Sequence, residues 1–467
     1  MSSRRRLAGA GPGAEAAALP APERTTTPFV WGVATSAFQI EGATREDGRG
    51  ESIWDRFASV AGNVANGDTG EPACDHYHRW PEDLDLMQSL GVRGYRFSLA
   101  WPRIQPSGRG PANEKGLDFY RRLVEGLLER EIEPLATLYH WDLPQELEDA
   151  GGWESRDVVE RFAEYAELVF DALGDLVQGW ITHNEPRCTS YLGYGTGVKA
   201  PGRRDWPTAL RAAHHVLLSH GVVVQAFRAS GPRGRIGISL DPTLVEPASS
   251  TEEDVAAAER VDGHQNRWFL DPLFRGAYPA DMLALHESRF GQLDVVRDGD
   301  LETISQPLDF LGVNFYTPHL VAADEGEELL GAREVDPGVA STEMGWPVVP
   351  RALTELLLRL KRDYGDLPLF ITENGAAYDD RLDGGDVVED PGRVAYLREH
   401  VASVEQARAE GVDVRGYYVW SLLDNFEWAH GYGKRFGIVY VDYATQRRIP
   451  KRSALWYRDL IAGRNGG

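Results

Sequence analysis

Two short apolar stretches of the 467-residue sequence each end on a glutamate, Glu185 and Glu373. Residues 179–185 and 369–373 have the pattern of buried strands, because each is a run of mostly apolar and β-branched residues that turn residues follow. Two carboxylates on strand ends can do the acid/base work that cleavage of a glycosidic bond needs. Either glutamate alone is weak evidence, since such a glutamate is more often an ion-pair partner or a helix cap. The pair together indicates sugar chemistry.

The elements that must position these glutamates are expected strands that alternate with helices. The expected strands cover residues 29–35, 92–98, 133–140, 179–185, 235–240, 308–316, 369–373 and 414–421. Apolar residues at helical spacing fall between them, for example Leu117, Tyr120 and Val124 after the candidate N-cap Asn113. Eight alternating units predict an α/β fold, a single (β/α)8 TIM barrel over residues 28–467, after a disordered tail at residues 1–27. An open doubly wound sheet also fits the alternation, but no G-x-G-x-x-G follows the first strand.

Polar and aromatic residues recur at the ends of these strands. The active sites of parallel barrels gather at the carboxyl ends of the strands, so these residues are candidates for one pocket. Amides and carboxylates can bind several hydroxyls at once, and a Trp ring can stack on a sugar ring. Each also has a purely structural interpretation: a lone histidine is usually a satisfied interior residue, and aromatic residues usually belong to the core. The candidates besides the glutamates are Gln39, Arg96, His140, Trp141, Asn184, Asn314, Tyr316, Trp420, Glu427 and Trp428.

A catalytic metal is the rival hypothesis, because the chain also carries several histidines and aspartates. The end of the first strand, where a metal-dependent barrel hydrolase would be expected to carry paired histidines, has none. His214 and His215 are adjacent on an expected helix and therefore point in different directions. No G-x-S-x-G motif supports a serine nucleophile. We therefore predict no metal and no cofactor. The other residues considered as metal ligands are His76, His78, His140, Asp142 and His183.

The composition restricts the partners. A net charge of −23 argues against nucleic acid, which needs clustered Lys and Arg, and favours a neutral or cationic ligand. Cys74 and Cys188 cannot form a disulfide framework, and no apolar run approaches the 18 residues of a membrane span. We predict a cytoplasmic protein with a small-molecule carbohydrate substrate and no nucleic-acid or membrane partner. The sequence leaves open whether it is a monomer or a homo-oligomer.

Six motifs in order resemble family 1 of the glycoside hydrolases, the β-glucosidase family. The resemblance extends from about Pro28 to Leu460, nearly the whole chain outside the tail. A single motif would be weak evidence, whereas six in order are highly specific. After the stretch 29–42, which resembles the N-terminal signature of the family, the motifs are residues 95–98 with Trp101, 139–144, 184–186, 314–316, 371–375 and 425–428.

The resemblance implies a (β/α)8 barrel whose fourth and seventh strands carry the two glutamates. It implies that Glu373 is the nucleophile and Glu185 the general acid/base, with Arg96, Asn314 and Tyr316 as supporting residues. Arg96 and Tyr316 would keep Glu373 ionised, and the charge on Glu373 would raise the pKa of Glu185. The implied sugar-binding residues are Gln39, His140, Trp141, Asn184, Tyr316, Trp420, Glu427 and Trp428, with Trp346 at the aglycone site.

Specific residues narrow the expected substrate. A glutamate rather than a glutamine at position 185 argues against the thioglucosidase branch of the family. A carboxylate at Glu427 would repel a 6-phosphate and disfavours the phosphoglycosidase branch. His183 and Arg187 stand where the resembled family frequently has apolar or aromatic residues, so we expect them to affect leaving-group preference and pH optimum rather than the class of reaction.

The resulting hypothesis is a retaining β-glucosidase that acts on small β-glucosides and short oligosaccharides, as in cellulose degradation. The alternatives are a transglycosylating β-glycosidase that also accepts galactosides and fucosides, and a non-catalytic sugar-binding barrel. The presence of both glutamates argues against the sugar-binding barrel, because a protein that only binds sugar would need neither.

Overall fold

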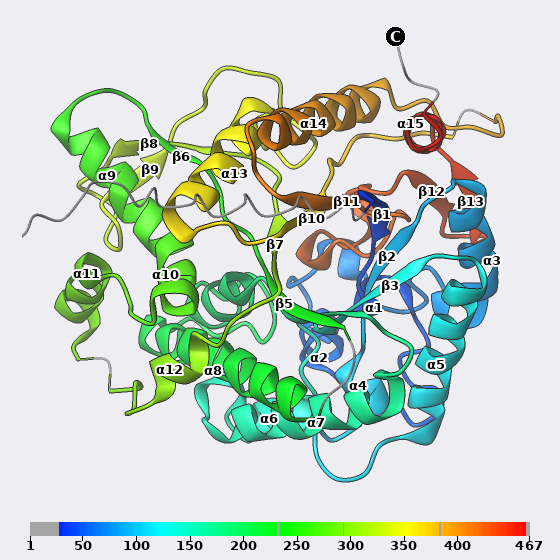
Figure 1. The fold of residues 1–467 in the computed structure, drawn as a ribbon, viewed down its shortest axis with the longest axis horizontal. Helices are drawn as coiled ribbons and strands as arrows, with labels where there is room; N and C mark the ends of the chain where they lie inside the picture. The colour runs from blue at the N-terminus through cyan, green and yellow to red at the C-terminus, as the bar shows by residue number, and fades with distance from the viewer. Residues whose placement is uncertain (1–27, 231–233, 293, 383, 464–467) are drawn as a thin grey trace, which may run out of the picture.

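Eight parallel strands close into a barrel in the computed structural model, which describes residues 28–230, 234–292, 294–382 and 384–463 (Figure 1). The strands follow one another around the barrel in the order β1, β2, β3, β4, β5, β7, β10, β11, and β11 pairs with β1. This confirms the predicted (β/α)8 barrel, while the predicted tail at residues 1–27 lies outside the described residues. The barrel strands are β1 (Val30–Ala34), β2 (Gly94–Ser98), β3 (Glu133–Tyr139), β4 (Gly179–Asn184), β5 (Arg235–Leu240), β7 (Phe310–Asn314), β10 (Leu369–Asn374) and β11 (Val414–Trp420).

Helices cover the outside of the barrel between the strands (Figure 1). The longer ones are α3 (His76–Ser89), α5 (Glu114–Glu129), α7 (Asp157–Leu173), α8 (Trp206–Ser230), α9 (Glu252–Asp262), α10 (Trp268–Arg275), α11 (Ala280–Phe290), α13 (Arg351–Tyr364), α14 (Pro391–Ala409) and α15 (Arg452–Ile461). The shorter ones are α1 (Ala37–Ile40), α2 (Ile53–Ser59), α4 (Trp101–Ile104), α6 (Gln145–Asp149) and α12 (Asp300–Ile304). Two small sheets lie outside the barrel, one of β6 (Val245–Pro247), β8 (His319–Ala323) and β9 (Ala332–Glu334), the other of β12 (Val439–Asp442) and β13 (Arg447–Pro450).

Helix α5 illustrates why these segments become barrel helices. Its buried residues include Leu117, Tyr120, Val124 and Leu127, which recur every three or four positions and form one apolar face toward the barrel. Asn113 does stand at the N-cap position, but its side chain makes no capping bond. Its amide Nδ2 instead donates to the backbone carbonyls of Asp47 and of Arg103 in α4, so the predicted cap is right in position and wrong in function.

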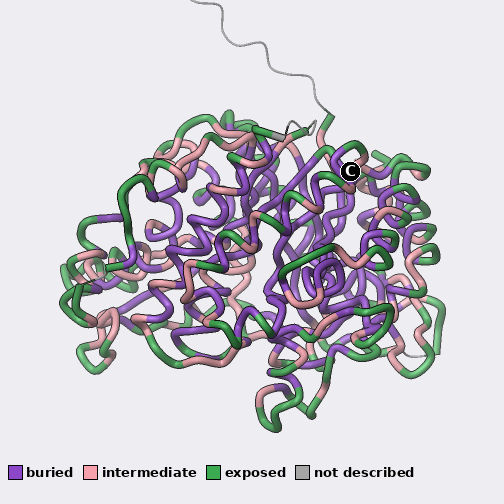
Figure 2. The backbone as a smooth tube through the Cα atoms, turned by 90° about the horizontal axis from the view of Figure 1, so that it is seen from below, coloured by how far each residue is buried: buried purple, intermediate pink, exposed green. Residues whose placement is uncertain are grey.

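The barrel is closed at its amino-terminal end by large apolar side chains. Phe310, Phe370 and Tyr418 belong to a buried cluster inside the barrel that also contains Leu135 and Ile181. The strands are buried on both faces, and exposure is concentrated in the outer helices and loops (Figure 2). An apolar plug at one end leaves the other end, where the strands terminate, for polar side chains.

Two glycines make room for this plug. A Cβ atom at Gly32 of β1 would lie 2.4 Å from Cδ1 of Tyr418, and one at Gly94 of β2 would lie 2.9 Å from its hydroxyl. Any larger residue at either position would therefore displace the Tyr418 ring.

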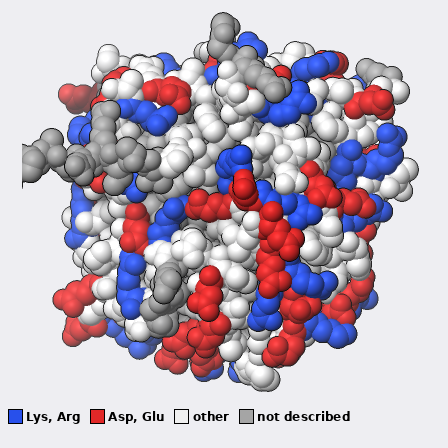
Figure 3. All heavy atoms as spheres, turned by 45° about the vertical axis from the view of Figure 1, so that its right-hand side comes forward, with Lys and Arg blue, Asp and Glu red and all other residues white. Residues whose placement is uncertain are grey.

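No helix in the described ranges is long and apolar enough to cross a membrane. On the face shown in Figure 3, acidic and basic side chains are interspersed. Ion pairs between exposed side chains occur in the described part of the chain, such as Arg56 with Glu51 and Arg452 with Glu389.

Candidate active site

One cavity of about 420 Å³ opens at the carboxyl ends of the barrel strands, and both glutamates line it. The structure places most of the predicted site residues in its wall and the other three directly behind it. The predicted residues in the wall are His140, Trp141, Glu185, Asn314, Tyr316, Trp346, Glu373, Trp420, Glu427 and Trp428. Arg96 bonds to Glu373 and Asn184 bonds to His140 in the wall, while Gln39 bonds to Asn425 and to the Phe426 carbonyl just before Glu427.

Glu373 is held from both carboxylate oxygens. It stands near the end of β10, where Arg96 Nη1 donates to its Oε1 over 2.6 Å and the Tyr316 hydroxyl donates to its Oε2 over 2.5 Å. The same Arg96 nitrogen also donates to the Thr372 carbonyl, which fixes the guanidinium against the strand. The side chains of Arg96 and Glu373 are 1% and 4% exposed. The carboxylate therefore has one orientation relative to the pocket.

Opposing effects act on the pKa of Glu373. Burial raises the pKa because it disfavours the charged form, while the positive charge of Arg96 and the Tyr316 hydrogen bond lower it. The predicted support from Arg96 and Tyr316 is present as direct contacts. The net direction is nevertheless upward, because burial is the largest effect.

Glu185 directly follows β4, and a neighbouring amide side chain orients its carboxyl group. Its backbone N–H donates to the Ser239 carbonyl over 2.8 Å, and Asn314 Nδ2 donates to its Oε1 over 2.8 Å. Burial raises the pKa of Glu185 most, and the charge of Glu373 raises it further. The direction agrees with the expectation from the resemblance, but burial rather than Glu373 is the first cause.

A chain of hydrogen bonds joins the two glutamates. Arg96 Nη2 donates to Asn184 Oδ1 over 2.5 Å, and Asn314 Nδ2 donates to the same oxygen over 2.9 Å and also to Glu185. Thr372 Oγ1 donates to Asn314 Oδ1 and thereby fixes which way that amide faces. The positions of Glu373 and Glu185 are therefore coupled through three buried side chains.

Aromatic rings form the wall beside these groups. The rings of Trp141 and Trp428 lie 4.5 Å apart, and His140 stacks on Trp420 at 5.8 Å with 19° between the planes. Trp141 Nε1 donates to the Asn184 carbonyl. Trp141, Glu185 and Trp428 all have positive φ, between 47° and 78°, a conformation that costs non-glycine residues energy and that the surrounding packing must maintain.

Two buried polar atoms in this wall lack a partner among the described residues, His140 Nδ1 and Glu427 Oε2. Buried polar atoms are nearly always hydrogen-bonded, so these atoms are available to ligand hydroxyls. Burial raises the pKa of Glu427 to about 8. A pKa near 8 favours the protonated form of Glu427 at neutral pH, which weakens the expectation that its charge alone would repel a 6-phosphate.

This arrangement of a barrel, two buried glutamates and an aromatic polar pocket can be compared with known proteins. The family model described as glycosyl hydrolase family 1 matches residues 22–466. The chain belongs to glycosyl hydrolase family 1.

Relatives of this glycoside hydrolase are similar over nearly their whole length. A thermostable β-glucosidase B of Thermobispora bispora is 52% identical over 94% of this chain and 90% of its own. A bifunctional β-D-glucosidase/β-D-fucosidase of Bifidobacterium breve is 46% identical over 93% and 97%. The solved family 1 β-glucosidase of Thermotoga maritima superposes with a TM-score of 0.90 at 45% identity, covering 93% of this chain and 97% of that one.

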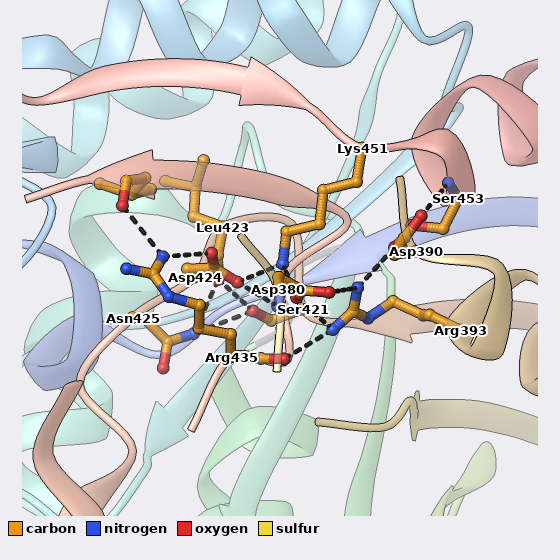
Figure 4. Close-up of polar contacts among 12 residues, drawn as sticks. Asp380, Asp390, Arg393, Ser421, Leu423, Asp424, Asn425, Arg435, Lys451 and Ser453 are labelled. Carbon is orange, nitrogen blue, oxygen red and sulfur yellow. Dashed lines mark hydrogen bonds and ion pairs between the residues drawn. The ribbon is translucent and has the colours of Figure 1, made fainter. Parts of the chain in front are cut away.

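A buried charge network connects the segments that follow the last barrel strands of this glycosidase (Figure 4). Lys451 Nζ donates to Asp380 and to Asp424, each over 2.6 Å, and all three side chains are buried. Arg393 also binds Asp380, and Arg435 binds Asp424. The network joins the segment after β10 to the segment after β11 and to the end of β13.

The segment after β11 carries part of the pocket. Asn425 follows Asp424 directly, and its Oδ1 accepts from Gln39 Nε2 over 3.0 Å. Gln39 Nε2 also donates to the Phe426 carbonyl, one residue before Glu427. The buried charges therefore fix the backbone that presents Glu427 to the cavity.

Sequence reasoning missed several wall residues. Asp241 directly follows β5, so the rule that selected the other strand ends applies to it as well. Lys199 lies on the long segment between β4 and α8, where no periodic pattern marks it, and its Nζ stands 3.6 Å from the centre of the Trp141 ring. His183, suspected of influencing the acid/base, faces away from the cavity and contacts Ser219 of α8.

Glu185 and two neighbouring side chains form a group that could hold a metal ion. Ligand atoms of Glu185, Cys188 and Asp241 lie within 4.8 Å of one another. Asp241, however, is engaged by the guanidinium of Arg187, whose positive charge disfavours a cation at the same carboxylate. His214 and His215 point to different partners, Asp300 and the Trp153 carbonyl, as expected for adjacent helical residues.

Proposed function

We propose that Glu373 is the nucleophile and Glu185 the general acid/base of a retaining β-glucosidase. The observation that carries the proposal is that both carboxyl groups are buried in one cavity and are joined through Arg96, Asn184 and Asn314. A retaining mechanism needs the two carboxyl groups about 5 Å apart, one to attack and one to transfer the proton.

The first step forms a covalent sugar–enzyme ester. A carboxylate oxygen of Glu373 attacks the anomeric carbon, and the bond from that carbon to the leaving-group oxygen breaks. Glu185, whose pKa burial and the charge of Glu373 raise, gives its proton to the leaving oxygen. Arg96 and Tyr316 favour the ionised form of Glu373 against the effect of burial and hold it in the orientation for attack.

The second step releases the sugar with its original configuration. Once Glu373 is esterified its charge is gone, so one cause of the raised pKa of Glu185 disappears. Glu185 then removes a proton from water, and the water oxygen attacks the anomeric carbon and displaces Glu373. Two inversions give net retention.

The sugar in the glycone position is an uncharged β-D-glucosyl residue. Glu427, His140 and Gln39 supply hydrogen-bonding groups for its hydroxyls, and the Trp rings supply its stacking surfaces. The named fucosidase activity of the Bifidobacterium breve relative supports tolerance of fucosides. An acceptor sugar that replaces water in the second step would make the enzyme a transglycosylase. The cytoplasmic location remains a prediction from composition.

Hydrolysis of a panel of chromogenic β-glycosides tests this function. We expect turnover of the β-glucoside, with the β-anomer of glucose as the first product by NMR and no loss of rate in EDTA. Oligosaccharide products at high substrate concentration would identify transglycosylation. Glucose binding without any turnover would contradict the proposal and favour a sugar-binding barrel.

A further inference from the structure

Arg187 and Asp241 form an ion pair in the wall of the pocket. Arg187 Nε and Nη2 lie 2.7 and 2.6 Å from the same oxygen, Asp241 Oδ2. The two side chains are 21% and 14% exposed, and both residues line the cavity that contains the glutamates. The pair is therefore firmly held and still reaches the space that a substrate occupies.

The pair lies on the leaving-group side of the pocket, defined here as the wall formed by Arg187, Cys188 and Asp241. Arg187 is two residues after Glu185, and the Cys188 thiol and the Asp241 carboxylate come within 4.8 Å of the Glu185 carboxyl group. Glu185 must contact the oxygen of the leaving group in the proposed mechanism. A leaving group attached to that oxygen extends along this wall.

The pair keeps hydrogen-bonding capacity for a ligand. Arg187 uses Nε and Nη2 on Asp241, and within the described part of the chain its Nη1 has no hydrogen-bond partner. Asp241 Oδ1 accepts from no other side chain among the same residues. A guanidinium N–H beside a carboxylate oxygen offers one donor and one acceptor, which suits the neighbouring hydroxyls of a sugar.

The charge of the pair is balanced, so it does not select an anionic or cationic leaving group. An aromatic ring in the place of Arg187 would present a flat stacking surface, whereas the ion pair presents polar groups that are best satisfied by hydroxyls.

We propose that the Arg187–Asp241 pair binds hydroxyl groups of a sugar leaving group, so that this enzyme favours β-linked glucose disaccharides over glucosides with flat or apolar aglycones. The inference rests on the proposed function. It makes Arg187 and Asp241 specificity-determining residues.

The test compares three substrates with the same glycone: cellobiose, p-nitrophenyl β-glucoside and n-butyl β-glucoside. Butanol, like glucose, needs a proton from Glu185 to leave, but it has no further hydroxyls. In the double variant R187M/D241N, which leaves no unpaired charge, we expect kcat/KM for cellobiose to fall about tenfold. The values for the other two substrates should change less than about threefold. Much of the loss should appear as a higher KM for cellobiose.

Two further variants serve as controls. R235M/E133Q removes an ion pair at the opposite end of the barrel, between the first residues of β5 and β3. It should leave kcat/KM for cellobiose unchanged relative to kcat/KM for the other two substrates. R187K keeps the positive charge but loses the planar fork of donors. It should lower kcat/KM for cellobiose, relative to the other two substrates, by less than the double variant does. R187K also provides the test if the double variant does not fold, as judged by thermal unfolding.

An equal change for all three substrates in the folded variants would overturn the inference and indicate a structural role. A parallel fall for cellobiose and n-butyl β-glucoside would also overturn it, because it would show an effect on proton donation by Glu185. If the unmodified enzyme hydrolysed none of the three, the proposed function itself would fail.

Discussion

Arg96 Nη1 lies 2.6 Å from Glu373 Oε1, and both side chains are almost fully buried. A buried carboxylate next to a single guanidinium is stable as an ion pair, whereas removal of either partner leaves an uncompensated charge. The contact therefore holds Glu373 in place and opposes the effect of burial on its pKa. The hydroxyl of Tyr316 has the same effect on the other oxygen.

Replacement of Tyr316 by Phe should shift the pH profile. The Tyr316 hydroxyl stabilises ionised Glu373 and so lowers its pKa; its loss raises that pKa. Since the nucleophile must be ionised, the acidic limb of kcat/KM against pH should move upward by about one pH unit, and the rate should fall. The control Y165F removes a buried hydroxyl that bonds a backbone carbonyl elsewhere. An acidic limb that does not move in Y316F would contradict the assigned effect.

Replacement of Glu185 by Ala should slow hydrolysis of p-nitrophenyl β-glucoside at least about a hundredfold. The first step survives because p-nitrophenolate leaves without a proton, but water is no longer activated in the second. Added azide needs no general base, so it should attack the sugar ester on Glu373 and give the β-glucosyl azide. The product is identified by NMR, and the α-azide would count against the assignment of Glu185.

The affinity of glucose should depend on the ionisation of Glu427. Its pKa is about 8, and a carboxylate accepts more hydrogen bonds from hydroxyls than a carboxylic acid does. Ligand binding then favours the ionised form, so competitive inhibition by glucose should strengthen as pH rises from about 6 to about 8. E427Q should bind glucose more weakly and lose this part of the pH dependence. The same pH dependence in E427Q would exclude Glu427 as its source.

Replacement of Lys451 by Met should destabilise the protein. It leaves Asp380 and Asp424 buried without their shared cation, which predicts a loss of about 3 kcal/mol in the free energy of unfolding, measured with denaturant. Because the network fixes the segment that carries Glu427, KM for a glucoside should also rise. K451M/D424N removes one of the stranded charges and should recover part of the stability. An unchanged free energy of unfolding in K451M would show that the fold does not depend on this charge network.

The sequence was most informative where a local pattern decides the structure. Strand β5 has the predicted bounds, Arg235–Leu240, because an apolar run between turn residues is sufficient to define it. Glu185 and Glu373 followed from the same patterns, since a strand end fixes where its last side chain lies. Boundaries shifted by a few residues elsewhere, as for β7, which begins at Phe310.

Features that depend on distant parts of the chain were not predictable. Lys451 pairs with Asp380, 71 residues away, and charged residues are rarely expected to be fully buried. Lys199 contacts the Trp141 ring from a long connecting segment. That segment has no periodic apolar pattern from which its path could be predicted. The Arg187–Asp241 pair required the spatial contact of the residues after β4 and β5.

The assignment of Glu373 as the nucleophile is tested most directly by Glu373→Ala with azide. The variant should fold, bind glucose and lose nearly all hydrolysis of p-nitrophenyl β-glucoside. Azide should then attack the anomeric carbon from the side that Glu373 occupied, restore release of p-nitrophenol and yield the α-glucosyl azide. A folded, sugar-binding variant that gives no azide product, or that gives the β-azide, would contradict the assignment.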